Sequence, residues 1–408
     1  MKVVLLTTAP LSLRFLRGHI RLLQENGADV FVIASPSPIL DAFAVDHGVE
    51  VSGIEMQRRI APFRDLVALC RLIYRLRRIR PDIVHAHTPK AGLLGMLAAL
   101  IAMAPIRLYH IHGLPLMTAG GIKRWLLWMC DAIACRLAHQ VFCVSQSIMH
   151  AVKSEGICRA EKLAILANGT IDGIDSAEQY NPNRFPPSTR LALRRSLNIA
   201  EGARVVGFVG RIVKDKGIYE LLEAFSQLSN EFDDLHLLIV GLFEGHQPIT
   251  LEAKATIEGD SRIHLVGFTE DPAPYYTLMD VLAFPTYREG FGLVAAEASA
   301  LEVPVVATSI PGCVDAVCDG VTGTLVPPKD ARALATAIAY YLRNPELSRQ
   351  HGNAGRKRVL QDFQPEQVRE ALWRRYSSWM NASQRRSTAR IEPMLPRRVD
   401  GHDDPSPR

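Results

Sequence analysis

The 408-residue sequence has few cysteines and no long apolar run. Its seven cysteines are an odd number and include no CxxC pair, which argues against a disulfide framework in a chain of this size. The longest stretch without a charged or strongly polar residue covers 91–104, shorter than the roughly 20 residues that cross a bilayer. The first residues, MKVVLL, enter a strand-like segment without the layout of a cleaved signal peptide. We therefore expect a cytoplasmic protein without a transmembrane helix.

Neither sign of charge dominates, because the sequence contains 47 Lys and Arg residues and 42 Asp and Glu residues. The first part of the chain is nevertheless basic: residues 1–185 carry 21 basic and 14 acidic side chains, whereas 186–382 carry 20 and 24. Segment 64–80, RDLVALCRLIYRLRRIR, is either an ordinary amphipathic helix or a helix that docks on anionic lipid together with segment 121–138. Nucleic acid is the weaker partner, because no aromatic stacking motif accompanies the charges.

Short apolar runs alternate with helical patterns, which indicates parallel sheets covered by helices on both faces. The expected strands are 2–8, 29–35, 82–88, 106–112 and 140–145, then 205–210, 236–240, 263–268, 281–286 and 304–308. The expected helices lie near 13–26, 64–79, 90–103 and 121–138, then 217–229, 250–258, 292–301 and 331–342. The pattern predicts two doubly wound α/β domains in tandem.

Three prolines within 181–187 interrupt this alternation and indicate a linker, because proline continues neither a helix nor a central strand. The first domain is therefore expected at 1–183 and the second at 188–365. Segment 366–380 is expected to form a final amphipathic helix, and the polar residues 381–408 a disordered tail.

The densest chemical signal is YREGFGLVAAE at 287–297, directly after an expected strand. Its Glu-Gly-Phe-Gly turn leads into a helix whose first backbone N–H groups, at Gly292 and Leu293, suit a phosphate. Glu289 lies above the strand end and Glu297 about one and a half turns into the helix, so both reach one ligand. A solvated loop acid and a helix-surface acid are the alternative interpretation.

Two carboxylates beside a phosphate site require cations, and GRIVKDKG at 210–217 supplies them. Arg211 leaves an expected strand and Lys216 precedes a helix, so both are expected at the carboxyl edge of the sheet. Arg binds a diphosphate in a bidentate way and Lys adds a point charge. Ordinary surface charges are the alternative.

GRIVKDKG followed by EGFGLVAAEA resembles the retaining family 4 glycosyltransferases of the GT-B fold. Their pattern has two Glu separated by seven residues, as at 289 and 297, and the resemblance covers residues 1–380. The stretches HTPKAG at 87–92 and NGTIDG at 168–173 resemble a bacterial subgroup that builds surface polysaccharides on lipid carriers. The first loop, TTAP, departs from the Gly-Gly that many members carry near the donor phosphate.

The resemblance implies a role for each motif. Glu289 contacts the donor sugar near the reacting carbon, and His112, in the HIHG that ends a strand, falls in the catalytic cleft. Glu297 holds the ribose hydroxyls, and two cations hold the diphosphate, so the resemblance implies neither a metal nor a cofactor. The implied donor-binding residues are Arg211, Lys216, Gly290, Phe291, Gly292, Leu293 and Glu297.

Two His-x-His pairs, 85/87 and 110/112, suggest zinc, because alternation places both members of a pair on one face of a strand. No nearby Cys or carboxylate completes a typical ligand set, so no metal site is expected. A satisfied structural histidine is the alternative role for His112.

The resemblance implies a retaining, metal-independent hexosyl- or N-acetylhexosaminyltransferase. Its first domain would bind a polyprenyl-diphosphate-linked saccharide and its second a UDP- or GDP-sugar, in exopolysaccharide, capsule or O-antigen assembly. It would lie peripherally on the inner face of the cell membrane, with the final helix crossing back to the first domain. The alternatives are a sugar-nucleotide epimerase of the same fold and a non-catalytic two-domain sugar-binding protein.

Overall fold

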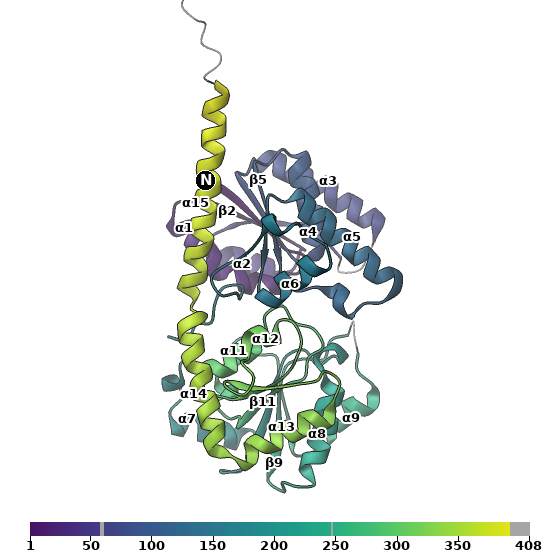
Figure 1. Cartoon of the computed structure of the whole chain (residues 1–408), viewed down its shortest axis with the longest axis vertical. Helices are drawn as coiled ribbons and strands as arrows, with labels where there is room; N and C mark the ends of the chain where they lie inside the picture. Colours follow the sequence, from purple (N-terminus) through teal and green to yellow (C-terminus); the bar gives the residue numbers. More distant parts are fainter. Residues whose placement is uncertain (58–60, 246–247, 392–408) are drawn as a thin grey trace, which may run out of the picture.

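The computed structural model describes residues 1–57, 61–245 and 248–391. Two α/β domains lie end to end, and two successive helices run along their side: α14 (Pro345–Asp362) beside the second domain and α15 (Pro365–Ile391) beside the first (Figure 1). Each domain is built on a single parallel sheet, as the alternation of apolar strands with helices predicts.

The first sheet has the order β3-β2-β1-β4-β5-β6-β7, with all neighbours parallel. Its strands are β1 Lys2–Leu6, β2 Asp29–Ala34, β3 Glu50–Gly53, β4 Ile83–His87, β5 Ile106–Ile111, β6 Gln140–Cys143 and β7 Leu163–Ile165. The α-helices between them are α1 Arg17–Glu25, α2 Pro38–His47, α3 Pro62–Ile79, α4 Pro89–Ile101, α5 Gly121–Leu137 and α6 Gln146–Ser154. The 3₁₀ segments are Pro10–Leu16, Pro115–Thr118 and Ala160–Lys162.

The second sheet has the order β10-β9-β8-β11-β12-β13 and is also parallel throughout. Its strands are β8 Arg204–Val209, β9 Leu235–Val240, β10 Ile263–Gly267, β11 Val281–Phe284, β12 Val305–Thr308 and β13 Gly323–Val326. The helices are α7 Pro187–Ser196, α8 Ile218–Ser229, α9 Leu251–Gly259, α10 Ala273–Tyr276, α11 Leu293–Ala300, α12 Cys313–Ala316, α13 Ala331–Arg343 and α14 Pro345–Asp362. Two 3₁₀ turns are Pro182–Arg184 and Lys214–Lys216.

The strands missed by the sequence patterns are short ones at or near the sheet edges: β3, β7 and β13. Their three or four residues are too few for a clear alternation, and polar or glycine residues interrupt β3 and β13. The ten expected strands are all present, shorter by one or two residues at several ends. In each sheet the strand order reverses beside the first strand of the domain, and this is where such sheets bind ligands.

The chain enters the second domain earlier than the proline-rich segment indicates. Ile174, Tyr180 and Phe185 belong to the core that packs on the second sheet, together with Phe284 and Val305. The expected first-domain limit at 183 therefore lies within residues that pack on the second domain, because the apolar side chains before the prolines are buried there.

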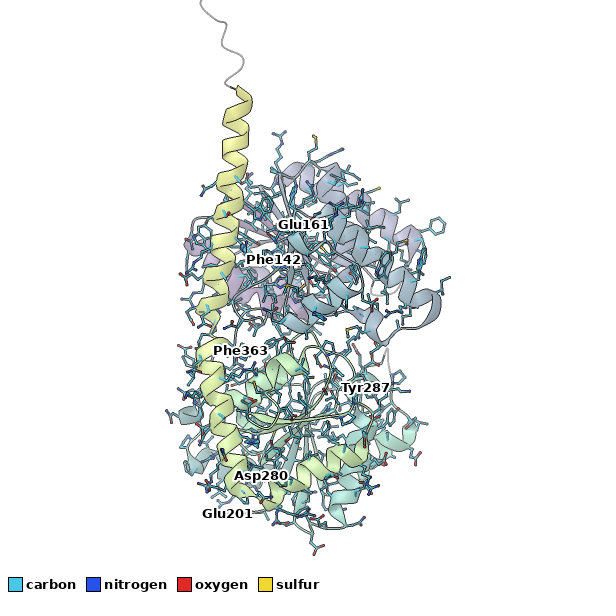
Figure 2. All side chains as sticks on the ribbon, in the orientation of Figure 1. Phe142, Glu161, Glu201, Asp280, Tyr287 and Phe363 are labelled. Carbon is cyan, nitrogen blue, oxygen red and sulfur yellow. The ribbon has the colours of Figure 1, made fainter. Side chains whose placement is uncertain are left out.

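Helix α15, Pro365–Ile391, crosses back to the first domain, as the GT-B resemblance implies (Figure 1). Phe363 marks the crossing in Figure 2. Val368, Leu372 and Tyr376, spaced four residues apart on one helix face, are fully buried in a core of the first domain. Helix α15 therefore connects the two domains a second time, in addition to the chain segment that leads from the first domain into the second.

The expected end of this helix at residue 380 is wrong, because α15 continues to Ile391. Segment 382–390, ASQRRSTAR, contains Ala, Gln and Arg and neither Gly nor Pro, so nothing in its composition stops the helix. The remainder of the expected tail, 392–408, lies outside the described residues. Within the described ranges, no helix is both long enough and apolar enough to cross a membrane.

Candidate active site between the two domains

The loops that follow β5 and β11 bring the two domains into direct contact. Gly290 lies so close to the first domain that a Cβ there would collide with the carbonyl oxygen of His112 and lie 2.8 Å from its carbonyl carbon. Gly113 faces the same turn: a Cβ on it would lie 3.6 Å from Gly290 Cα. The HIHG and EGFG segments, far apart in the sequence, therefore form one junction.

Lys216 and Glu289 form an ion pair at this junction, and their side chains are only 17% and 15% exposed. Lys216 ends a 3₁₀ turn, and Gly217 follows with φ of 73°. A Cβ at Gly217 would collide with the backbone of Pro285, so glycine allows the turn to lie against the end of β11. Glu289 also accepts a hydrogen bond of 3.0 Å from Thr286 Oγ1. The two predicted residues thus meet in one partly buried pair.

Arg211 lies at the expected sheet edge but has a different partner. Its guanidinium pairs with Glu244, and its side chain is 47% exposed. A less exposed cation nearby is Arg288, whose side chain is 25% exposed and lies 3.7 Å from Asp215. The structure therefore brings Lys216, but not Arg211, into contact with Glu289.

The turn from Gly290 to Leu293 has the backbone geometry of a helix start. Gly292 has φ of 77° and is the N-cap of α11. Phe291 is 3% exposed, and its ring meets that of Phe363 edge to face at 4.9 Å between centroids. The Phe291 side chain therefore anchors the turn in the core, and only its backbone is available for a ligand.

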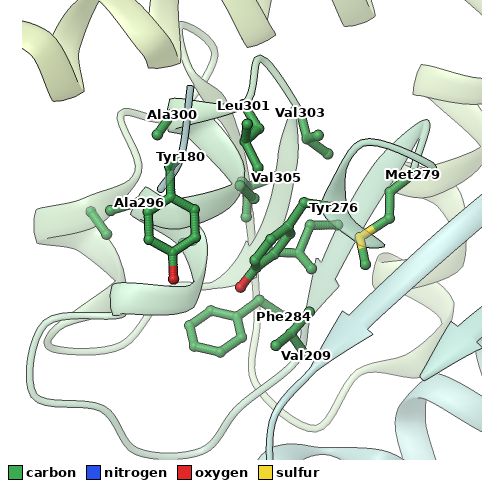
Figure 3. Packing of buried hydrophobic residues seen from close by; sticks show 14 of the residues in the cluster. Tyr180, Val209, Tyr276, Met279, Phe284, Ala296, Ala300, Leu301, Val303 and Val305 are labelled. Carbon is green, nitrogen blue, oxygen red and sulfur yellow. The ribbon is translucent and has the colours of Figure 1, made fainter. Parts of the chain in front are cut away.

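Glu297 lies in α11 and is held by two tyrosines. Tyr276 donates a hydrogen bond of 2.8 Å to its carboxylate, and Tyr180 lies near the same carboxylate. Figure 3 shows both tyrosine hydroxyls at the same side of the apolar cluster. Burial raises the pKa of Glu297, whereas the tyrosine hydrogen bonds and Arg14 of the first domain oppose this shift. Sequence reasoning missed both tyrosines, because neither stands in a recognisable motif.

His112 contacts a second histidine rather than a carboxylate. Its Nε2 lies 2.9 Å from Nδ1 of His87. Burial, with a smaller effect from His19, lowers the pKa of His112 to about 3, so the imidazole is neutral near pH 7. The ring of His110 lies 4.7 Å away between centroids. The two His-x-His pairs, which the sequence presents as separate features, therefore meet in neighbouring strands.

Polar contacts between the domains surround the junction, and the sequence motifs did not indicate them. Ser145 Oγ donates a hydrogen bond of 2.8 Å to the carbonyl oxygen of Gly290. Ser147 hydrogen bonds the carboxylate of Asp315, and its Oγ accepts a 2.7 Å hydrogen bond from the backbone N–H of Gly312. Isolated serines carry no spacing signal, so only the fold reveals these contacts.

A hollow of about 710 Å³ lies beside these contacts. Both domains line it: α6 contributes Gln146, Ser147 and His150, and the second domain contributes Pro311 and Asp315. It adjoins the contact between the domains through Ser147 and Asp315, and its lining includes neither Lys216 nor Glu289.

Two family models match the chain. The model described as Glycosyltransferase Family 4 matches residues 14–171, and the model described as Glycosyl transferases group 1 matches residues 189–358. The chain is 33% identical over 384 residues to the capsular polysaccharide biosynthesis glycosyltransferase CapM of Staphylococcus aureus, covering 94% of this chain and 98% of CapM. It is 29% identical to the putative glycosyltransferase EpsD of Bacillus subtilis, over 74% of this chain and 77% of EpsD.

Solved structures agree on the fold. HepE of Anabaena, in complex with UDP-glucose, superposes with a TM-score of 0.76 at 23% identity, over 93% of this chain and all of HepE. The sucrose-phosphate synthase of Thermosynechococcus elongatus gives 0.75 at 22% identity, over 94% and 100%. With the match to CapM along almost its whole length, these findings show that the chain belongs to glycosyltransferase family 4 and has the GT-B fold.

Proposed function

We propose that the protein is a retaining glycosyltransferase that moves a hexose or N-acetylhexosamine from a UDP- or GDP-sugar to a lipid-linked saccharide in bacterial surface-polysaccharide assembly. The observation that carries the proposal is the Lys216–Glu289 pair at the contact between the domains. The pair supplies a cation that could bind a diphosphate and, beside it, a carboxylate that could bind a sugar hydroxyl. The similarity to CapM supports a role in polysaccharide assembly, and the UDP-glucose bound by HepE supports a nucleotide-sugar donor.

In the proposed reaction, Lys216 is shared between Glu289 and the donor diphosphate. The acceptor hydroxyl attacks the anomeric carbon on the face from which the diphosphate departs, and its proton passes to a phosphate oxygen of the leaving group. Lys216 stabilises the negative charge that develops there, and Arg211 joins it by exchanging Glu244 for phosphate. These two cations make a metal at the diphosphate unnecessary in this scheme.

The remaining residues would position the two substrates. Glu297, oriented by Tyr276 and Tyr180, would accept hydrogen bonds from the ribose hydroxyls. The backbone from Gly290 to Leu293 would bind sugar and phosphate oxygens at the start of α11. Neutral His112 would lie near the sugar, and the hollow between α6 and Asp315 would hold the acceptor saccharide.

A donor panel tests the proposal directly. The full chain is incubated with UDP- and GDP-sugars and a polyprenyl-diphosphate saccharide, and product masses are measured. We expect one donor to extend the acceptor by a single sugar. Conversion of a nucleotide sugar into its epimer without acceptor would favour the epimerase alternative. Sugar binding without turnover of any donor would favour the binding-protein alternative.

Replacing Glu297 with glutamine is expected to weaken nucleoside-diphosphate binding about 10- to 100-fold, since hydrogen bonds to a charged group contribute about 1.5–3 kcal/mol. Calorimetry with UDP and GDP measures the change. Glu302→Gln is the matched control, because Glu302 follows the same helix and its side chain is 46% exposed. Equal nucleotide affinity in the Glu297 variant and the parent would remove Glu297 from the donor site.

The proposal also places the first domain on an anionic membrane surface. Helices α3 and α5 both pack against α4, on one side of that domain (Figure 1). They expose large apolar side chains: Phe63 is 87%, Ile122 77% and Trp125 56% exposed. Arginines and lysines interleave with them along both helices, as in helices that lie in the membrane interface.

Changing Phe63 and Trp125 to serine is expected to lower binding to vesicles of anionic lipid at least tenfold, because the two side chains would lose their burial in the interface. Co-sedimentation with phosphatidylglycerol vesicles measures it. The control replaces Val45 and Leu251 with serine. These two residues lie on other helices, and they are 84% and 86% exposed. Helices α3 and α5 are not the docking face if the Phe63 and Trp125 variant binds vesicles as well as the parent. The same conclusion holds if the control variant loses as much vesicle binding as the Phe63 and Trp125 variant.

A further inference from the structure

A cluster of buried histidines lies inside the first domain, on one face of its sheet. His85 and His87 stand on β4, and His110 stands on the neighbouring strand β5, directly paired with His87. All three are at most 1% exposed. Their rings are close: the centroids of His85 and His87 are 4.2 Å apart, and those of His85 and His110 are 5.5 Å apart. Polar rings this deep in a core require partners.

In His85 and His87, one ring nitrogen already has a polar partner, and this contact fixes the direction of the second nitrogen of the same ring. Nδ1 of His85 lies 2.7 Å from the hydroxyl of Tyr376, and Nδ1 of His87 lies 2.9 Å from Nε2 of His112. Nε2 of both rings, and both nitrogens of His110, have no hydrogen-bond partner among the described residues. One nitrogen of each of the three residues lies within 4.8 Å of the others.

We propose that His85, His87 and His110 bind one divalent transition-metal ion, with Zn²⁺ as the best match. Three imidazoles are a known zinc ligand set, and the fourth position takes a water or stays open. Zn–N distances of about 2.1 Å need nitrogens about 3.4 Å apart in a tetrahedron, which small ring rotations supply. The contacts to Tyr376 and His112 correspond to the outer-shell hydrogen bonds that usually orient metal-bound histidines.

This site differs from the proposed transfer site in place and role. It would tie β4 to β5 and, through Tyr376, to the crossing helix α15. It would also fix the ring of His87 and thereby its contact with His112 at the domain junction. The metal is therefore a positioning element for the junction, and the proposed diphosphate contacts do not depend on it.

The test uses the full chain, freed of metal with a chelator, loaded with Zn²⁺ alone and passed through a desalting column. Elemental analysis is expected to find about one zinc per chain. His85→Gln and His110→Gln are each expected to lower zinc affinity at least tenfold. His264→Gln is the matched control, because His264 pairs with His236 at 2.8 Å in the second domain and is not in the cluster. It should leave zinc binding unchanged.

X-ray absorption of the unaltered zinc-loaded chain covers the case in which a variant does not fold. Three imidazole ligands at about 2.0–2.1 Å are expected. Less than about 0.1 zinc per chain, sulfur ligands in the absorption spectrum, or equal loss in the His264 variant would overturn the proposal. Absence of zinc would mean that ordered water satisfies the histidine nitrogens. None of these measurements depends on sugar transfer, so the absence of zinc binding would leave the proposed transferase function intact.

Discussion

Replacing Lys216 with alanine is expected to lower kcat/KM for sugar transfer about 10²- to 10³-fold. The change removes the cation assigned to the leaving diphosphate, and loss of one preorganised charge or donor at a developing anion typically has an effect of this size. It also leaves Glu289, which is 15% exposed, without its ion-pair partner. Initial rates at several donor concentrations measure the change and separate kcat from KM.

Lys214 provides the matched control, because it lies in the same 3₁₀ turn and is exposed. Lys214→Ala is expected to keep kcat/KM within about twofold, as for surface substitutions away from a site. Lys216→Arg retains the charge and should restore part of the lost rate. Similar losses in the Lys214 and Lys216 alanine variants would show that the turn, rather than the Lys216 ammonium, matters.

Replacing Gly290 with alanine is expected to lower kcat/KM about 10²-fold, with a smaller loss of nucleotide affinity because the backbone N–H groups of the proposed donor site are retained. The added Cβ would collide with the His112 carbonyl oxygen and lie 3.0 Å from Val144 Cγ2, so the two domains could not meet as they do here. A displacement of about 1 Å between substrate-bearing parts commonly has an effect of this size on rate. Parallel kinetics and calorimetry with UDP and GDP distinguish the two quantities.

Gly120→Ala is the control for this variant, since no described atom lies within 4 Å of a Cβ added at Gly120. It should leave both rate and affinity unchanged. If Gly290→Ala transfers sugar at the parental rate, the domain contact through Gly290 and His112 is not part of the reacting arrangement.

The sequence predicted the parts of the fold that depend on long apolar strands and amphipathic helices. It also predicted that Lys216 and Glu289 share one sheet edge, because both follow strands that end there. It did not predict that Arg211 pairs with Glu244, since Glu244 lies in a loop without a motif. Nor did it predict the tyrosines that hold Glu297, because their proximity depends on how loops fold over α11.

The histidines illustrate the same limit. Periodicity placed each His-x-His pair on one strand face, but the absence of Cys and carboxylate in the sequence nearby argued against a metal. Strand pairing sets His87 opposite His110, and this adjacency supplies a third imidazole that sequence distance conceals. Likewise, helix propensity within 382–390 extends α15 beyond the apolar face that marks its expected end.

The measurement that tests the central proposal most directly is the anomeric configuration of the product. An α-linked nucleotide sugar that proves active in the donor panel is reacted with the lipid-linked acceptor, and the coupling constant of the anomeric proton is measured by NMR. Same-face attack at the Lys216–Glu289 site predicts an α-linked product. A β-linked product, or no sugar transfer from any nucleotide donor, would contradict the account.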